Sequence, residues 1–151
     1  MRRPVRCTAI MLGVGVVLAG TMTTASATRS APAPTVREAS TPILVDCTWH
    51  SNVRPTDFIL ACGDGNSRLT GLRWSHWGTQ SATAEGVNLV NDCKPYCAAG
   101  RFHPYTVTVR LDSPQSWKKN PVREHFTRMT LTYHTGKPEG YTQVMNYPLW
   151  N

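Results

Sequence analysis

Alternation of apolar and polar residues is the feature that most constrains the fold of this chain. In residues 105–112 the odd positions are apolar and the even positions are polar, and the segment 126–133 repeats this alternation from Arg128 to Tyr133. The apolar positions of the first segment are Tyr105, Val107, Val109 and Leu111. A period of two is typical of a strand with one buried face, so each segment predicts a half-buried strand.

Shorter segments extend this pattern toward the N-terminus. Residues 57–62 are apolar on both faces and predict a central strand, and the Gly63-Asp64-Gly65-Asn66 sequence after them predicts a hairpin turn. The returning strand is expected at residues 69–77. Further short strands are predicted at residues 43–49 and 86–92, with a long loop at residues 114–121.

These segments predict an all-β fold. No segment shows convincing helical spacing of apolar residues over three turns. We expect six to seven short antiparallel strands that form a small sandwich or a partly open barrel, stabilised by disulfides.

The N-terminus has the pattern of a signal peptide. Arg2, Arg3 and Arg6 precede an uncharged apolar stretch that is shorter than a membrane span, and Ala25 and Ala27 form an A-x-A cleavage pattern. We therefore expect residues 1–27 to be removed on export and the mature protein to be secreted. No membrane association is expected after this cleavage.

The mature chain divides into a linker and one domain. Residues 28–42 are rich in Ala, Pro, Ser and Thr and predict a disordered linker, and residues 43–151 are the expected β domain. Without its leader the chain has 16 − 3 = 13 basic and 9 acidic residues, a net charge of +4. The basic residues are scattered, which argues against nucleic-acid binding, and we expect a monomer.

Four cysteines remain after cleavage, and an even number in a secreted domain predicts two disulfides. These are Cys47, Cys62, Cys93 and Cys97. Three connectivities are open, and we favour Cys47 with Cys62 and Cys93 with Cys97 because each pair is close in sequence. The competing zinc site lacks paired C-x-x-C motifs. No metal and no cofactor are therefore expected.

Aromatic residues suggest a first candidate binding surface. Trp74 and Trp77 flank His76 in one predicted strand, and strict alternation places the two indoles on opposite faces. With Trp117, Tyr96 and Tyr141 they form a possible platform for sugar rings, such as those of a cell-wall polysaccharide. The alternative is that the tryptophans fill a small core.

The segment between Cys93 and Cys97 is a second candidate. It is short and contains Lys94, Pro95 and Tyr96, so a disulfide would hold a basic and an aromatic residue in a rigid loop. Such a loop loses little entropy when it binds an extracellular protein. It predicts, as an alternative function, a secreted protease inhibitor. The simpler interpretation is a turn that is closed by a disulfide and binds no partner.

No catalytic residues can be assigned from the sequence. It contains no G-x-S-x-G motif, and the histidines occur singly. Asp64, Glu85 and Asp92 could meet in space as in a glycosidase, which leaves a small extracellular hydrolase as a further alternative.

Three separated motifs, in order, resemble those of small exported proteins common in actinobacteria. They are C-x-D-G at residues 62–65, W-x-x-W-G at 74–78 and N-x-C-x-P-x-C-A-x-G at 91–100, followed by the F-T-x-x-T-x-T-Y strand at 126–133. The resemblance implies export and a shared fold, and it brings no activity with it. The sequence therefore predicts a secreted binding or interaction module with an unknown ligand.

Overall fold

The structure is a computed structural model, and it describes residues 40–151. The predicted signal peptide and most of the predicted linker lie outside the described residues. The strands are β1 (Leu44–Val45), β2 (Ser51–Asn52), β3 (Phe58–Ile59), β4 (Ser67–Trp77), β5 (Ala82–Asn91), β6 (Phe102–Trp117), β7 (Asn120–Tyr133) and β8 (Val144–Pro148). A single turn of 3-10 helix, η1, covers Cys97–Ala99.

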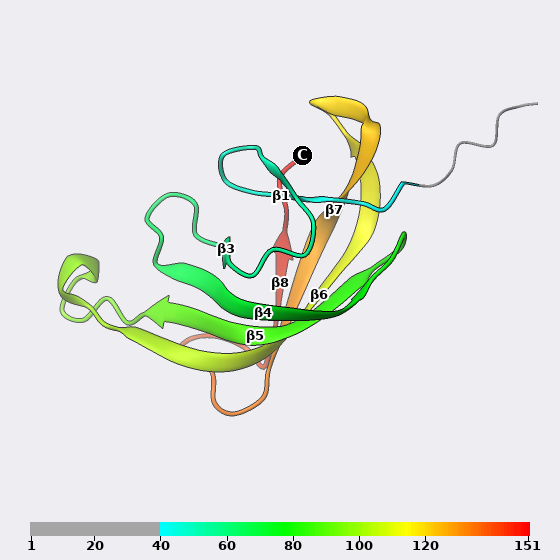
Figure 1. The fold of residues 1–151 in the computed structure, drawn as a ribbon. Helices are drawn as coiled ribbons and strands as arrows, with labels where there is room; N and C mark the ends of the chain where they lie inside the picture. The colour runs from blue at the N-terminus through cyan, green and yellow to red at the C-terminus, as the bar shows by residue number, and fades with distance from the viewer. Residues whose placement is uncertain (1–39) are drawn as a thin grey trace, which may run out of the picture. The chain divides into compact units, whose positions relative to one another are not determined.

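Six of these strands form one antiparallel sheet in the order β3-β4-β5-β6-β7-β8. The sheet curls into a half-barrel, and β1 lies over its inner side (Figure 1). Strands β1 and β2 pair separately as a two-stranded sheet. The prediction of an all-β fold is confirmed, and of its two forms the structure is the partly open barrel.

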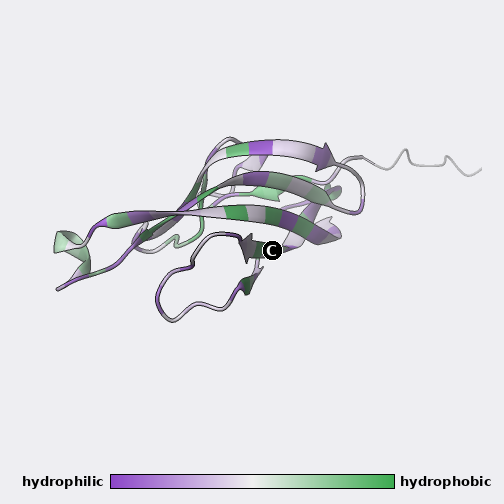
Figure 2. Ribbon diagram, turned by 90° about the horizontal axis from the view of Figure 1, so that it is seen from below, coloured by the Kyte–Doolittle hydropathy of each residue, from purple (hydrophilic) through white to green (hydrophobic). Residues whose placement is uncertain are grey.

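The core lies on the inner face of the half-barrel. In β6 and β7 the predicted alternation holds, because Val107, Val109 and Leu111 are buried and pair with Tyr133, Leu131 and Met129. Figure 2 shows hydrophobic and hydrophilic residues alternating along the strands. On the neighbouring strand β5 the facing positions are small, namely Ala82, Ala84 and Gly86.

Two register shifts in β4 break the alternation that the sequence predicts there. The pairing of β4 with β5 is interrupted between Thr70 and Arg73 and again between Trp74 and His76. At each shift β4 has one residue more than the facing part of β5. Leu72 and Trp77 therefore both lie on the core side of the sheet. Gly71 adopts a φ of 60° at the first shift, a conformation that glycine tolerates without strain.

The predicted loop at residues 114–121 is wrong. Strand β6 runs on to Trp117 and β7 begins at Asn120, so the two strands meet in a hairpin. Pro114 and Pro121 suggested a loop. Neither proline, however, lies in a part of a strand that pairs with a neighbour on both sides. The pairing of β5 with β6 ends at Leu111, which leaves Pro114 at an edge, and Pro121 lies in the register shift near the hairpin tip.

The predicted strands at residues 43–49 and 57–62 are much shorter than expected. At the second, only Phe58 and Ile59 pair, and β3 is an edge strand, so the prediction of a central strand is wrong. The backbone N–H groups of Leu60 and Ala61 both donate to the carbonyl of Ser67, which turns the chain. Strand β5, in contrast, begins four residues before the predicted start at Gly86.

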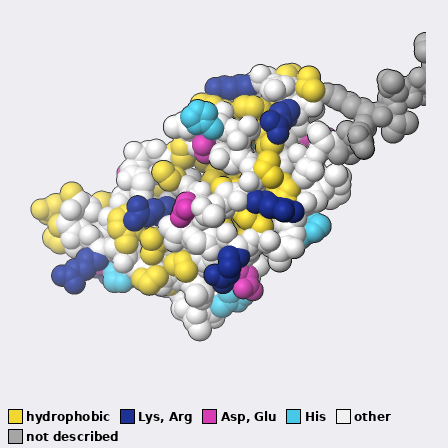
Figure 3. All heavy atoms as spheres, viewed as in Figure 1, with side chains coloured by type: hydrophobic (Ala, Val, Ile, Leu, Met, Phe, Trp, Pro, Cys, Tyr) yellow, Lys and Arg dark blue, Asp and Glu magenta, His cyan; other side chains and the backbone are white. Residues whose placement is uncertain are grey.

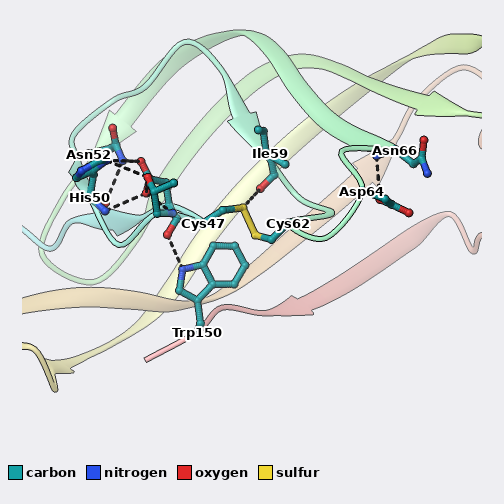
Figure 4. Close-up of a disulfide and its surroundings, with 10 residues drawn as sticks. Cys47, His50, Asn52, Ile59, Cys62, Asp64, Asn66 and Trp150 are labelled. Atoms are coloured by element: carbon teal, nitrogen blue, oxygen red, sulfur yellow. Dashed lines mark hydrogen bonds and ion pairs between the residues drawn. A yellow bond between two sulfur atoms is a disulfide. The ribbon is translucent and has the colours of Figure 1, made fainter. Parts of the chain in front are cut away.

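Residues 42–62, here called the covering segment, close the inner face of the half-barrel. Three indole N–H groups hold it by hydrogen bonds to its backbone carbonyls: Trp77 to Pro42 (3.0 Å), Trp74 to Pro55 (2.8 Å) and Trp150 to Asp46 (2.9 Å). Figure 4 shows Trp150 beside the Cys47–Cys62 disulfide. Pro42 is buried, so packing begins one residue before the predicted domain start.

Both favoured disulfide pairings are confirmed. Cys47 is bonded to Cys62 within the covering segment, and Cys93 to Cys97 between β5 and η1. Among residues 40–151, no helix has the length and apolar character needed to cross a bilayer.

Candidate binding pocket beside the Cys93–Cys97 loop

A polar pocket of about 360 Å³ lies where β5 ends and β6 begins. We call it the β5–β6 pocket. Its side chains come from three parts of the chain: the end of β5 with the Cys93–Cys97 loop, the start of β6, and the turn before β8. The polar groups and rings that define it are Asp92, Lys94, His103, Tyr105, Glu139 and Tyr141.

Asp92 organises one side of this pocket. Its Oδ1 accepts hydrogen bonds from the backbone N–H groups of Lys94 (3.1 Å) and Arg101 (2.9 Å), and His103 Nε2 lies 2.9 Å from its Oδ2. The Arg101 N–H, followed by His103 and the Lys94 N–H, lowers the pKa of Asp92 to about 2. Asp92 is therefore a carboxylate at neutral pH and joins both ends of the loop.

Asn91 supports the same loop. Its Oδ1 accepts the N–H of Cys93 (3.0 Å), and its Nδ2 donates to the carbonyl of Cys97 (2.8 Å). Gly100 packs so closely against Asn91 that a Cβ there would overlap the amide oxygen. The disulfide and the side chains of Asn91 and Asp92 thus fix the loop together.

Lys94 and Glu139 form an ion pair across the pocket. Lys94 Nζ lies 2.6 Å from Glu139 Oε2, and both side chains are exposed. Each partner favours the charged form of the other, which raises the pKa of Lys94 and lowers that of Glu139. Exposed pairs of this kind add little stability, so these charges can be shared with a ligand at small cost.

Two tyrosine rings form the apolar part of the pocket. Tyr105 and Tyr141 each make an edge-to-face contact with the buried ring of Tyr133, with centroids 6.2 Å apart. Tyr133 Oη donates to the buried Asn88 Oδ1 (2.8 Å), and burial raises the pKa of Tyr133. This core hydrogen bond holds Tyr133, and through it the two rings of the pocket.

The chemistry of the pocket is that of a recognition site for a polar ligand. Two carboxylates accept hydrogen bonds, Lys94 and His103 can donate them, and the tyrosines offer ring surface. The residues that line the pocket include no Ser, Thr or Cys, so it has no hydroxyl or thiol nucleophile of the usual protease kind. The hydrolase alternative stays a prediction. Among residues 40–151, no cluster of three or more His, Cys, Asp or Glu side chains is placed to hold a metal ion.

Of the candidate residues from the sequence, the structure brings Lys94 and Tyr141 into the pocket. Tyr96, on the same loop, is 64% exposed and is not part of the lining. The pocket also includes His103 and Glu139, which the sequence analysis did not single out. Asp92 was noted only as one of several scattered acids, although its place next to Cys93 was a usable signal.

The tryptophan platform is not formed. Trp77 is only 8% exposed, and Trp74 packs against it edge-to-face with ring centroids 4.5 Å apart. The register shift between Trp74 and His76 places both indoles on the core side, so the expectation of opposite faces fails. His76 itself is exposed. Trp117 is also buried, in a small cluster with Ile43 and Val45.

The inhibitor alternative gains no support from the loop geometry and stays a prediction. The Lys94 ammonium is paired with Glu139 instead of extending freely toward a protease. Cys93 adopts a φ of 50°, outside the extended backbone that suits strand-like pairing with a protease.

Comparisons of the chain with protein-family models, curated proteins and solved structures find no match in any of the three.

Proposed function

We propose that the mature chain is a secreted binding module and that the β5–β6 pocket is its ligand site. The observation that carries the proposal is the convergence of the Lys94–Glu139 ion pair, the Asp92–His103 contact and two tyrosine rings from three separate parts of the chain. The A-x-A pattern at the N-terminus and the two disulfides support its place outside the cell.

The lining of the pocket favours a saccharide of the cell wall as its ligand. Sugar hydroxyl and acetamido groups both donate and accept hydrogen bonds, which fits carboxylates next to an ammonium and an imidazole. The C–H face of a sugar ring packs on tyrosine. Asp92 and the two tyrosines are held in place by the surrounding structure before a ligand binds. Binding therefore costs little side-chain entropy.

A titration with chitotetraose, a soluble chain of N-acetylglucosamine, tests the ligand site. We expect binding that Glu139→Gln or His103→Ala weakens roughly tenfold or more, because a hydrogen bond to a charged group contributes about 1.5–3 kcal/mol. Glu85→Gln and His76→Ala are matched controls, since both residues are exposed and lie outside the pocket. Equal losses in the control variants would contradict the proposed site.

Export is tested separately by mass spectrometry of protein from culture medium. We expect a chain that begins at Thr28 and contains four paired cysteines. A retained leader, or free thiols at Cys47 and Cys62, would contradict secretion of the oxidised module.

A further inference from the structure

A second exposed surface lies at the tip of the β6–β7 hairpin. We call it the hairpin-tip patch, and its members are Trp49, Lys118, Lys119, Val122 and Arg123. All five residues are exposed to solvent, and the exposed fraction is 39% for Trp49 and 68% for Val122. Lys119 Nζ lies 3.8 Å from the centroid of the Trp49 ring, so the turn of the covering segment and the hairpin meet there. Figure 3 shows Lys and Arg side chains beside hydrophobic ones at the end where this hairpin lies.

The turn around Trp49 is built to expose the indole. Asp46 Oδ1 accepts the backbone N–H groups of Thr48 and His50, both at 2.9 Å, and the Asp46 carbonyl accepts the N–H of Trp49 at 3.0 Å. Trp49 has a φ of 67°, a left-handed conformation that costs energy for a bulky residue. Backbone strain of this kind is concentrated at functional sites.

The patch is also basic. Among the described residues, no ion pair joins Lys118, Lys119 or Arg123 to an acid. The nearest acids in sequence are Asp46 and Glu124. The Asp46 carboxylate is occupied by the hydrogen bonds of its own turn. Glu124 directly follows Arg123 in the chain.

From these observations we propose that the hairpin-tip patch binds the surface of a lipid bilayer that contains anionic lipids. Anionic headgroups attract Lys and Arg, and tryptophan prefers the boundary between headgroups and acyl chains. A soluble polyanion would need only the cations and would leave the strained, exposed indole without a role. This surface contact differs from the expectation that the mature chain has no membrane association.

Co-sedimentation with vesicles tests the proposal. The purified mature chain is expected to bind vesicles of equal parts phosphatidylglycerol and phosphatidylcholine. Its affinity for vesicles of phosphatidylcholine alone should be much lower. Lys118→Ala and Lys119→Ala should each weaken binding about fivefold, and Lys137→Ala, at an exposed lysine outside the patch, should not.

Trp49→Gly separates a bilayer from a soluble polyanion. Glycine suits the backbone at this position, so the variant should keep the thermal unfolding midpoint of the parent and still bind anionic vesicles at least fivefold more weakly. The proposal is overturned if Trp49→Gly binds vesicles like the parent. It is also overturned if soluble polyphosphate binds as tightly as vesicles, or if neutral and anionic vesicles bind equally.

Discussion

The two disulfides close segments that differ in almost every other respect. The covering segment, with Cys47–Cys62, contributes fully buried side chains at Ile43 and Leu44 and accepts hydrogen bonds from three indoles. Residues 94–97 of the Cys93–Cys97 loop are all exposed, and the loop borders the β5–β6 pocket. The same covalent bond therefore lies against the core in one region and beside the candidate pocket in the other.

The largest expected effect is that of Trp77→Ala. This change removes the contacts of Trp77 with Trp74 and Phe126 and its hydrogen bond to Pro42. A loss of about 3–5 kcal/mol in the free energy of unfolding is expected in urea denaturation. The affinity of the folded protein for chitotetraose should stay unchanged, and a loss of binding with little loss of stability would return Trp77 to the ligand site.

Removal of the disulfides one at a time compares the two regions directly. Chain-entropy estimates give about 3 kcal/mol for Cys47→Ser/Cys62→Ser and about 2 kcal/mol for Cys93→Ser/Cys97→Ser. The Cys47→Ser/Cys62→Ser variant should lose the full estimated free energy of unfolding, because buried contacts surround the covering segment. The Cys93→Ser/Cys97→Ser variant should lose less than its estimate, because the loop is exposed. Denaturation midpoints of the two double variants give the measurement, and a larger loss for the loop variant would contradict the comparison.

The sequence contained much of the fold because alternation and turn residues are local signals. It predicted the strands around residues 105–112 and 126–133, and the cysteine spacing predicted both disulfides. The errors arose where long-range contacts decide the outcome. The register shifts in β4 turn Trp77 inward, and tertiary packing extends β6 through Pro114.

The candidate pocket was less accessible to sequence analysis for the same reason. Lys94 stood out because it lies between two cysteines. Glu139 is 45 residues away from Lys94, and only the folded sheet brings the two together. No local pattern marks His103, which acquires its partner when Asp92 closes the loop.

Acid should weaken the packing of the covering segment through His125. This residue is buried, with Nδ1 2.9 Å from the Gln115 carbonyl oxygen, and its neighbour Ile43 belongs to the covering segment. Burial lowers the pKa of His125 in the folded protein below the ordinary value of 6.5, which applies in the unfolded state. As the pH falls below about 6.5, the unfolded state therefore binds more protons than the folded state. Stability is therefore complete above that pH and falls as the pH falls below it.

Urea denaturation between pH 7.5 and 5 tests this dependence, with His125→Gln as the control for the four exposed histidines. The variant should show a smaller decrease in stability over the same range. An identical decrease in both proteins would contradict the assignment to His125.

The smallest effect on global stability is expected for Asp92→Asn. Asp92 has a folded pKa of about 2, below its ordinary value of 3.8, so its contribution is present above pH 4 and is lost as the pH falls toward 2. Exchange of the Lys94 and Arg101 amide protons should accelerate in Asp92→Asn while the thermal midpoint changes little. Unchanged exchange at these amides would show that Asp92 does not organise the loop.

The most direct measurement is the affinity of the two double cysteine variants for chitotetraose, at a temperature where both remain folded. Cys93→Ser/Cys97→Ser should bind about tenfold more weakly than the parent, because the loop that carries Lys94 is no longer held in place. Cys47→Ser/Cys62→Ser should bind like the parent. Weaker binding in the second variant, with normal binding in the first, would contradict the division between a core that supports and a loop that binds.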